Sequence, residues 1–376
     1  MNITIAQGPY YPVPPLLNTG AEKVWYGLGR AFAAAGHTVV HFSRRFSGLP
    51  DFELDGGVQY VRIQSRDAPR SMKLYHLYDA VYSWRVRRML PVGADVVITN
   101  CLWLPVYLRT ASRGQVYVHV ARHPKGQMRL YRHASRLQAV SNTVADAIVR
   151  ELPGARSRVR VIPPYLSNDP RPLTETEFAD RSRTVLYVGR IHPEKGVHLL
   201  VMAFAGLDQP GWRLELIGSH EAGRGGGGQG YLDQLRRLAG RDVVLLGSVA
   251  QEELNAHYRR AAVLVYPSLA ERGESFGMVP LEAMACGCAV VVSDLACFRD
   301  YLAPEENGLS FDHRASDAVD SLRRALRRLV SDAGLRQRLA RAGYDTAQTY
   351  RLDRIAPRYL DDFASLTGKS DRVRIP

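Results

Sequence analysis

The chain has 376 residues, of which 46% are apolar and 23% charged, a composition typical of globular proteins and unlike that of disordered or fibrous chains. This length exceeds one ordinary hydrophobic core and predicts two domains. No apolar run approaches the roughly 18 to 20 residues that a membrane span needs. The opening MNITIAQG lacks the basic start and apolar core of a signal peptide, so we expect a cytoplasmic protein.

The net charge of +13 is distributed unevenly along the chain. Residues 1–180 hold 23 Lys and Arg against 13 Asp and Glu. Such an excess points to an anionic partner of that half: lipid, nucleic acid or an anionic substrate. No recognition motif for nucleic acid accompanies the charge, so we expect no nucleic-acid partner. Cys286 and Cys288 have no second pair of ligands at metal-binding spacing, so we predict buried thiols and no metal site.

The first half predicts a series of strands that alternate with helices. It opens with a strand at Ile3–Gln7, a Pro-rich loop and a helix at Ala21–Ala35 that Gly36 ends. β-branched runs predict further strands at His37–Ser43, Asp95–Thr99, Gln115–Val120, Leu137–Val140 and Val159–Ile162. This alternation is typical of a parallel sheet with crossover helices, and we assign it to a first domain, residues 1–168.

A polar, Pro-rich stretch without periodicity follows, and we predict a linker at residues 169–181. A second Rossmann-like series, residues 182–350, then opens with TVLYVG and continues with RLELIGS, VVLLGS, AVLVYPS and AVVVSD. The last helical pattern, Ile355–Leu366, comes after this sheet is complete. We therefore expect residues 351–376 to return to the first domain.

A glycine-rich stretch, residues 223–230, matches the pattern of a dinucleotide fingerprint through Gly223, Gly225 and Gly228. The turn between strand and helix is too long for that fingerprint, and the next strand carries no acid at its end to hold a ribose. We interpret the stretch as a flexible loop.

The stretch ERGESFGMVPLEAMACG places two carboxylates, Glu274 and Glu282, around a predicted helix start at Met278. Pro280 suits the first turn of a helix, where its missing N–H costs nothing. The free N–H groups of that turn form an anion site, and carboxylates accept hydrogen bonds from sugar hydroxyls. The arrangement suits a diphosphate with a hydroxylated ring on each side, as in a nucleotide diphosphate sugar.

Two cations follow the first strand of the same predicted sheet. The sequence GRIHPEKG presents Arg190 and Lys195 at the carboxyl end of that strand, where ligands bind in open parallel sheets. Together these side chains can neutralise a diphosphate and stabilise a leaving nucleotide.

At this point the chain resembles the family-4 retaining glycosyltransferases of the GT-B architecture, glycosyltransferase group 1. The motifs that carry the resemblance are YVGRIHPEKG, LIGS, VVLLGSV, YPSLAERGESFGMVPLEAMACG, VVVSD, ENGLSF and, in the first half, YPVPPLLNTGAEKVWYGLGRAFAAAGHTVV. The resemblance implies an α/β fold of two Rossmann-like doubly wound domains that face each other across a cleft. It also implies transfer of a sugar from a nucleotide diphosphate sugar, in the UDP or GDP form, without a further cofactor.

By this resemblance, Arg190 and Lys195 contact the diphosphate, Glu274 the hydroxyls of the donor sugar, and Glu282 the ribose. His119 lies beside the reacting sugar; the alternative is a partly buried histidine that caps a strand. The remaining donor-binding residues are Gly20, Gly189, Val249 beside the nucleobase, Ser275, Phe276, Gly277, Met278 and Val279.

The sequence departs from the family pattern in two places. PYLS, residues 164–167, stands where an N-G-V-D-like turn is usual, and ACFRD places Asp300 where a G-G-x-x-E-like stretch is usual. No Asp-x-Asp motif occurs, which agrees with a metal-independent mechanism.

Three interpretations of the function stay open. The first is a retaining hexosyltransferase-type enzyme that acts on a saccharide, a lipid-linked glycan or a natural product. The second is a catalytically inactive protein of the same fold that binds anionic lipid or a nucleotide sugar. The third is a sugar phosphorylase or a nucleotide-sugar epimerase.

Residues 70–90 mix basic and aromatic side chains at helical spacing. Such a helix suits a membrane interface, where rings lie at headgroup depth and cations meet anionic lipid. We expect weak, peripheral contact with an anionic membrane there; the alternative is that Tyr75, Tyr78 and Tyr82 pack inward and the arginines are merely solvated.

Overall fold

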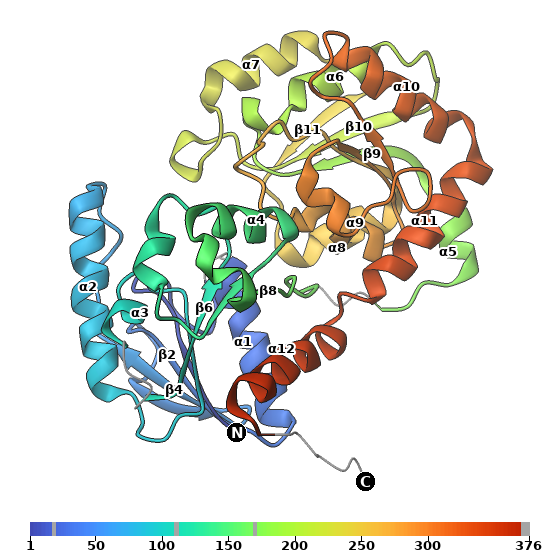
Figure 1. Cartoon of the computed structure of the whole chain (residues 1–376). Coiled ribbons are helices and arrows are strands. Elements are labelled where there is room, and N and C mark those ends of the chain that lie inside the picture. Colours follow the sequence, from blue (N-terminus) through green and yellow to red (C-terminus); the bar gives the residue numbers. More distant parts are fainter. Residues whose placement is uncertain (17–19, 109–112, 168–170, 370–376) are drawn as a thin grey trace. The chain divides into compact units, whose positions relative to one another are not determined.

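The computed structural model describes residues 1–16, 20–108, 113–167 and 171–369 (Figure 1). The chain divides into two compact units. The first unit consists of Met1–Ser167 together with Arg351–Pro376, and the second unit is Asn168–Tyr350. The last helix of the chain thus belongs to the first unit.

The described residues of the first unit form an eight-stranded sheet in the order β3-β4-β2-β1-β5-β6-β7-β8. All neighbouring strands pair in parallel except β3 with β4. The strands are β1 (Asn2–Ala6), β2 (Thr38–Arg44), β3 (Phe52–Asp55), β4 (Val58–Ile63), β5 (Val96–Thr99), β6 (Gln115–Val120), β7 (Arg136–Ala139) and β8 (Val159–Val161). Because β1 pairs with β2 on one side and β5 on the other, the strand order reverses at β1 and β5.

The antiparallel hairpin of β3 and β4 was absent from our prediction. Its strand β3 alternates charged residues with Phe52 and Leu54, which are both exposed, so no buried face marks it in the sequence. The turn signal is Gly56–Gly57, where both residues have positive φ angles of 55° and 77°. Such glycine pairs favour two-residue hairpin turns and could have revealed the hairpin.

Helices cover both faces of this sheet, and the last one packs on the first. The helices are α1 (Gly20–Ala34), α2 (Met72–Met89), α3 (Leu104–Tyr107), α4 (Asn142–Glu151) and α12 (Leu352–Thr367). From α12, Tyr359 contacts the rings of Trp25 and Phe32 on α1, and Phe363 contacts Tyr117 on β6. A buried ion pair of 2.8 Å joins Arg136 on β7 to Asp362 on α12. Aromatic packing and this ion pair hold α12 in the first unit.

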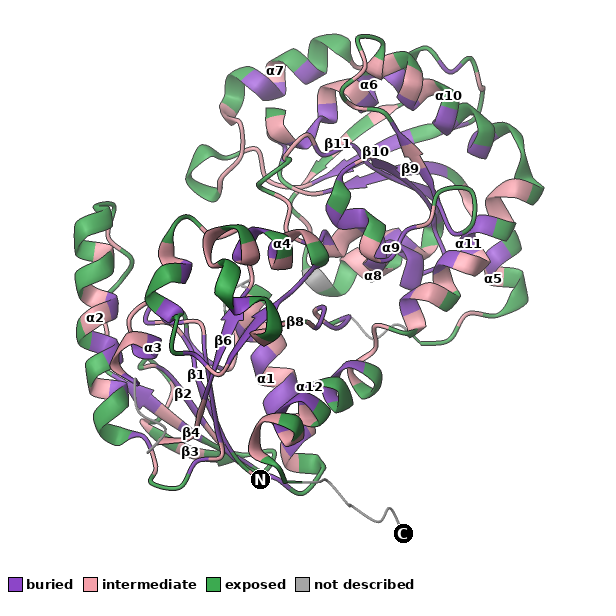
Figure 2. Ribbon diagram, viewed as in Figure 1, coloured by how far each residue is buried: buried purple, intermediate pink, exposed green. Residues whose placement is uncertain are grey.

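The described residues of the second unit form a six-stranded, wholly parallel sheet in the order β11-β10-β9-β12-β13-β14. The strands are β9 (Ser182–Val188), β10 (Arg213–Ile217), β11 (Val243–Gly247), β12 (Ala261–Tyr266), β13 (Ala289–Ser293) and β14 (Leu309–Phe311). The helices are α5 (Glu175–Ala179), α6 (Val197–Ala205), α7 (Gly228–Leu238), α8 (Gln251–Arg260), α9 (Met278–Ala285), α10 (Ala318–Ser331) and α11 (Ala333–Gln348). In each unit the strands are largely buried, while the outer helix faces are exposed (Figure 2). The prediction of two Rossmann-like domains is confirmed.

The expected linker contains a helix. Within residues 171–181, the side chain and backbone of Thr174 exchange hydrogen bonds with Glu177, a capping box that starts α5. Phe178 on α5 is buried against the ring of Tyr344 on α11. Residues 171–181 are therefore part of the second unit. The sequence T-E-T-E, residues 174–177, is a capping-box pattern that could have predicted this helix. Residues 169 and 170 lie outside the described part of the chain.

Candidate functional site

The site in the second unit is built where the strand order reverses. Strand β9 leads to β10 and β11 on one side, whereas β12, β13 and β14 follow on the other. The carboxyl ends of β9 and β12 are therefore the switch point, the place where open α/β sheets bind ligands. The loop after β9 carries Arg190 and Lys195, and the loop after β12 carries Glu274.

These two loops meet through a buried ion pair. The Nζ atom of Lys195, the last residue of the short 3₁₀ turn Pro193–Lys195, lies 2.7 Å from Oε2 of Glu274. The side chains are only 10% and 12% exposed. The same carboxylate oxygen accepts hydrogen bonds from Tyr266 Oη at 3.0 Å and Ser268 Oγ at 3.3 Å. Three donors thus hold this carboxylate in place.

Tyr266 and Ser268 were absent from our predicted site. Both belong to the sequence YPS directly after the apolar core of β12, so their place at a strand end was the available signal. Burial raises the pKa of Tyr266 well above its usual value, with the nearby Glu274 carboxylate adding to the rise. The phenol therefore stays protonated and donates. All described bonds to Glu274 involve Oε2, which leaves Oε1 available within the described structure.

Glycine is required at two points of this edge. A Cβ on Gly218, after β10, would lie 1.8 Å from the carbonyl oxygen of Gly189. A Cβ on Gly277 would lie 2.4 Å from a ring carbon of Phe298, and Gly277 has a φ of 81°. These close approaches bring the loop after β10 and the start of α9 tightly against their neighbours.

Helix α9 begins at Met278, as the sequence predicted, with Gly277 as its N-cap. The N–H groups of its first turn have no carbonyl partner within the helix and form one pole of the helix dipole. Phe276, just before the cap, is buried beside Tyr301, whose hydroxyl donates to the carbonyl of Gly277 at 2.7 Å. Ser275 and Val279, on either side, are intermediate in exposure.

Glu282 lies in the second turn of α9 and is half-buried. Tyr258 on α8 donates from Oη to Glu282 Oε2 at 3.2 Å. Burial raises the pKa of Tyr258 well above its usual value, with Glu282 adding to the rise, so the hydroxyl stays a donor. This tyrosine was also absent from the predicted site, since it lies on a separate helix.

Arg190 contacts the glycine-rich stretch. Its guanidinium, 43% exposed, pairs with Glu194 and donates to the carbonyl of Gly225. Gly227 N donates to Ile191 O at 2.9 Å, and a Cβ on Gly226 would lie 2.2 Å from the backbone of His220. We interpreted this stretch as a flexible loop, but its hydrogen bonds attach it to the loop after β9.

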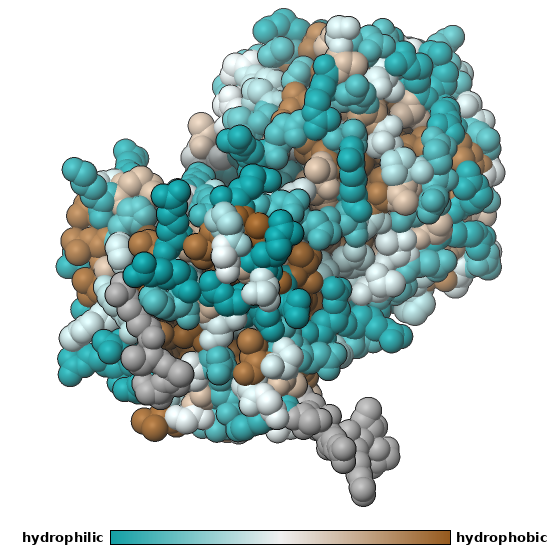
Figure 3. Space-filling model, in the orientation of Figure 1, coloured by the Kyte–Doolittle hydropathy of each residue, from teal (hydrophilic) through white to brown (hydrophobic). Residues whose placement is uncertain are grey.

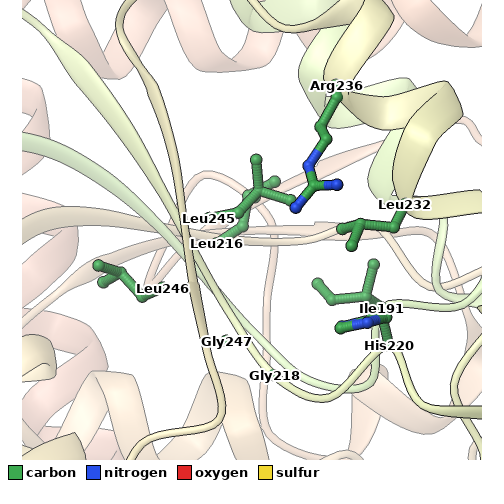
Figure 4. Close-up of a pocket in the computed structure, with 9 residues that line it drawn as sticks. All are labelled: Ile191, Leu216, Gly218, His220, Leu232, Arg236, Leu245, Leu246 and Gly247. Atoms are coloured by element: carbon green, nitrogen blue, oxygen red, sulfur yellow. The ribbon is translucent and has the colours of Figure 1, made fainter. Parts of the chain in front are cut away.

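A cavity of about 230 Å³ lies beside these loops (Figure 4). Its lining combines apolar side chains such as Leu216 and Leu232 with Arg236 of α7, whose guanidinium points toward the cavity, and His220 (Figure 4). Gly247, the last residue of β11, also lines it, and Val249 follows two residues later. Val249 itself is not a lining residue.

In the first unit, His119 lies near the carboxyl end of β6 and is only 6% exposed. Its Nδ1 is hydrogen-bonded to Oε1 of Gln138 on β7, and the edge of its ring faces Trp25 at 5.2 Å between centroids. Burial lowers the pKa of His119 to about 4, against a smaller opposing effect of Gln138. The ring is therefore neutral at neutral pH.

Gly20 is the first residue of α1 in the first unit. Apart from its chain neighbours and its own helix backbone, no described atom lies within 4 Å of a Cβ built on it, so packing among the described residues does not require glycine there. A requirement imposed by a bound diphosphate stays a prediction.

Among the described residues, no helix has both the length and the apolar content that crossing a bilayer demands. The same residues contain no cluster of three or more His, Cys, Asp or Glu arranged to hold a metal ion.

The fold, the two switch points and the paired Lys195 and Glu274 define a two-domain α/β protein of the GT-B architecture. Residues 173–346 match the family model described as glycosyl transferases group 1, and residues 18–166 match the model of glycosyltransferase family 4. The chain belongs to this glycosyltransferase family.

Among similar sequences is a D-inositol 3-phosphate glycosyltransferase of Streptomyces avermitilis, 31% identical over 265 residues, or 66% of this chain and 56% of that protein. A phosphatidyl-myo-inositol mannosyltransferase of Mycobacterium tuberculosis is 32% identical over 209 residues, 53% of this chain and 51% of that protein. The aligned part spans only about half the length of these curated relatives.

Two solved structures share the fold. A sucrose-phosphate synthase of Thermosynechococcus elongatus superposes with a TM-score of 0.76 at 22% identity, over 98% of this chain and 100% of that one. The Anabaena protein HepE, in complex with UDP and glucose, has a TM-score of 0.72 at 16% identity, over 97% of this chain and 100% of that one.

Proposed function

We propose that this protein transfers a sugar from a nucleotide diphosphate sugar to a hydroxyl group of an acceptor, with retention of the anomeric configuration. The observation that carries the proposal is the meeting of Lys195 and Glu274 at the switch point of the second unit. A cation for the diphosphate and a carboxylate for sugar hydroxyls lie there together.

The diphosphate would bind to groups that are already oriented. An ammonium has three hydrogens to donate, so Lys195 can hold Glu274 and still donate to a phosphate oxygen. The first-turn N–H groups of α9 add donors and a favourable dipole. Arg190 can exchange its exposed pairing with Glu194 for the diphosphate, since a pair between solvent-exposed charges is worth roughly 1 kcal/mol or less.

The remaining contacts would orient the sugar and the ribose. Oε1 of Glu274 would accept from hydroxyls of the transferred sugar, while Glu282, held by Tyr258, would accept from the ribose. His119, neutral because it is buried, would accept from a further sugar hydroxyl.

In the reaction, the acceptor oxygen bonds to the anomeric carbon as the bond from that carbon to the diphosphate oxygen breaks. The departing diphosphate takes the electron pair and then the acceptor's proton. Lys195 and Arg190 stabilise the charge that develops, a role that divalent metal ions fill in other transferases. We therefore propose a metal-independent reaction.

The acceptor would be anionic or carried by an anionic lipid. Helix α2 exposes the apolar side chains of Leu74, Leu77 and Val81 at helical spacing. They line a groove of about 430 Å³ together with Arg66 and Arg85. Figure 3 shows apolar and hydrophilic residues side by side where α2 lies in Figure 1. Apolar side chains among arginines suit the interface of an anionic membrane.

The aromatic part of our prediction for residues 70–90 was partly wrong. Tyr82 is buried, and Tyr75 stacks on Tyr10 at 4.2 Å between ring centroids. Trp84 alone among the four aromatic residues is exposed, with Arg88 over its ring at 4.7 Å. The proposed contact therefore depends on the aliphatic side chains and Trp84. The inositol phosphate and phosphatidylinositol in the names of the relatives are anionic acceptors and support the proposal.

The experiment that tests the function begins with donor identification. UDP, GDP and dTDP sugars are screened for a rise in melting temperature, because a ligand at 100 times its Kd stabilises the folded state by about 2.7 kcal/mol. The donor found is then incubated with candidate acceptors, and the anomeric configuration of the product is determined by NMR.

The outcomes separate the alternatives. Transfer predicts nucleotide release that depends on the acceptor, whereas a phosphorylase requires inorganic phosphate and an epimerase releases no nucleotide. An inverted product would contradict retention. If no nucleotide sugar shifts the melting temperature, the donor site is wrongly assigned.

A further inference from the structure

We propose that Gln138 is the positioning residue that fixes the tautomer of His119, so that Nε2 of the imidazole presents a lone pair to a hydroxyl group of the substrate. This inference rests on the proposed glycosyl transfer, because it assigns a role to His119 in that reaction. It follows from the hydrogen bonds around one buried amide.

The two residues face each other across neighbouring strands. His119 on β6 and Gln138 on β7 are direct register partners in a parallel pair. Side chains at paired positions of parallel strands lie on the same face of the sheet. Both are buried, with Gln138 at 0% and His119 at 6% exposure, so water does not compete strongly for their hydrogen bonds.

The orientation of the Gln138 amide is determined by its main-chain partners. Its Nε2 donates to the carbonyl oxygens of Ala139 at 2.9 Å and Ile162 at 2.6 Å. A flipped amide would place its oxygen against both carbonyl oxygens, where no hydrogen exists to form a bond. The nitrogen must therefore face the carbonyls, and Oε1 must face His119.

This orientation decides which nitrogen of His119 carries the proton. Oε1 of Gln138 can only accept, so Nδ1 of His119 must donate to it. Burial lowers the pKa of His119 to about 4, so the ring holds a single proton near neutral pH. Because that proton is on Nδ1, Nε2 has an unprotonated lone pair. No described residue forms a hydrogen bond with this Nε2.

A neutral amide suits this task better than a carboxylate would. A carboxylate beside His119 would stabilise the imidazolium and raise the pKa of the ring. The lone pair on Nε2 would then be protonated at a higher pH and could no longer accept from a hydroxyl. Gln138 orients the ring without adding charge, which keeps His119 an acceptor over the whole neutral range.

The first test reads the tautomer directly in the intact chain. With ¹⁵N-labelled histidine, an unprotonated ring nitrogen resonates far downfield of a protonated one, and long-range couplings assign it to Nδ1 or Nε2. The His119 signals are identified by their loss in His119→Asn. We expect a protonated Nδ1 and an unprotonated Nε2 at pH 7. The opposite tautomer, or an imidazolium, would overturn the inference.

The second test uses substitutions. Gln138→Leu removes the acceptor and should lower kcat roughly 10- to 100-fold, by analogy with the loss of a partner that orients a metal-ligating histidine, with both tautomers populated in the spectrum. The control is Leu137→Val, a conservative core change on the same strand. Equal losses of kcat in the two variants would show a merely structural role for Gln138.

The tautomer of the wild-type protein remains informative if the leucine variant does not fold, because its measurement needs no substitution. Gln138→Glu is unsuitable as a charge control, because its second carboxylate oxygen would face the carbonyl oxygens of Ala139 and Ile162. If the wild-type protein transfers no sugar but shows the expected tautomer, the proposed function is wrong. The conclusion that Gln138 fixes the tautomer of His119 still holds in that case.

Discussion

The two Rossmann-like units treat charge in opposite ways at the carboxyl ends of their sheets. In the second unit the cations at the switch point already have anionic partners, since Lys195 pairs with Glu274 and Arg190 with Glu194. In the first unit a buried pair near the carboxyl ends of β6 and β7, His119 and Gln138, is neutral, and it lies beside the switch-point strands β1 and β5 rather than on them. The carboxyl ends of two similar sheets thus differ in the charge that their buried side chains hold.

The excess positive charge of the first unit lies elsewhere. On α2, Arg87 and Arg88 are exposed at the last turn, and Arg85 donates to the main-chain carbonyl of Gln64. Exposed cations can attract an external anionic partner, whereas the buried Lys195 is held in a fixed position by Glu274. The comparison agrees with our proposals that the second unit binds the donor and that the first unit attracts an anionic surface.

Among single substitutions, the largest expected effect on catalysis is at the buried pair of the second unit. Lys195→Ala should reduce kcat by a factor that corresponds to about 2.7–4 kcal/mol, the value of one preorganised donor to a developing anion. It also leaves Glu274 buried without its cation. The control is Lys369→Ala, which removes an exposed lysine that pairs with Asp95 at 2.6 Å in the first unit. Equal kcat values for the two variants would place the diphosphate elsewhere.

Acidification should lower the stability of the first unit before that of the second. The buried His41 has a pKa lowered to about 3, mainly by burial and further by Arg62, and the pKa of His119 is lowered to about 4. Both pKa values lie below the usual 6.5 of an unfolded histidine. Between each lowered pKa and 6.5, the unfolded chain therefore binds more protons than the folded one. Stability should therefore fall as the pH drops from about 7 toward 4, by roughly 1.4 kcal/mol for each unit of pKa difference.

Hydrogen exchange at several pH values measures this loss unit by unit. We expect amides of β2 and β6 to lose protection on acidification before those of β9 and β12. The variant His41→Leu should flatten the pH dependence of the first unit. Simultaneous loss of protection in both units would contradict the expected difference in acid sensitivity between them.

The donor site predicts a smaller effect for the carboxylate on α9. Glu282→Ala should weaken binding of the nucleotide sugar by about 1–3 kcal/mol, because a charged acceptor is lost. Titration calorimetry measures the change in Kd. Glu305→Ala, which removes an exposed carboxylate paired with Arg328 at 2.6 Å, should leave the Kd unchanged. An unaltered Kd for the Glu282 variant would remove this residue from the site.

The smallest effect per residue is expected on the surface of the first unit. Replacing Arg85, Arg87 and Arg88 by Gln should reduce co-sedimentation with anionic vesicles, by about 1 kcal/mol per cation at low salt. The control replaces three exposed arginines of α10 in the second unit, Arg324, Arg327 and Arg328. Equal binding to neutral and anionic vesicles, or equal losses in both triple variants, would exclude the membrane as partner.

Much of the fold could be predicted because buried parallel strands are nearly continuous apolar runs, as in β12 and β13. The helix start at Met278 followed from a glycine and a proline. The hairpin of β3 and β4 has no buried face along β3, and helix α5 depends on a capping box rather than on periodicity. Such local signals are easily overlooked beside the strong pattern of the core.

The candidate site was only partly predictable for a different reason. The sequence placed Lys195 after the end of a strand and Glu274 just before the start of a helix, because element boundaries can be read from the pattern. Gln138 became visible only with the register of β6 and β7. Tyr258 reaches Glu282 from another helix, and no sequence pattern encodes such a contact.

The return of α12 to the first unit has a consequence for biosynthesis. During translation every residue of the second unit leaves the ribosome before Tyr359 and Phe363, so the second unit can complete its core first. Until those residues emerge, Trp25 and Tyr117 lack their aromatic neighbours on α12, and Arg136 lacks Asp362. The N-terminal part of the chain is thus made first and finished last, and during that interval its apolar surface is the natural substrate for a chaperone.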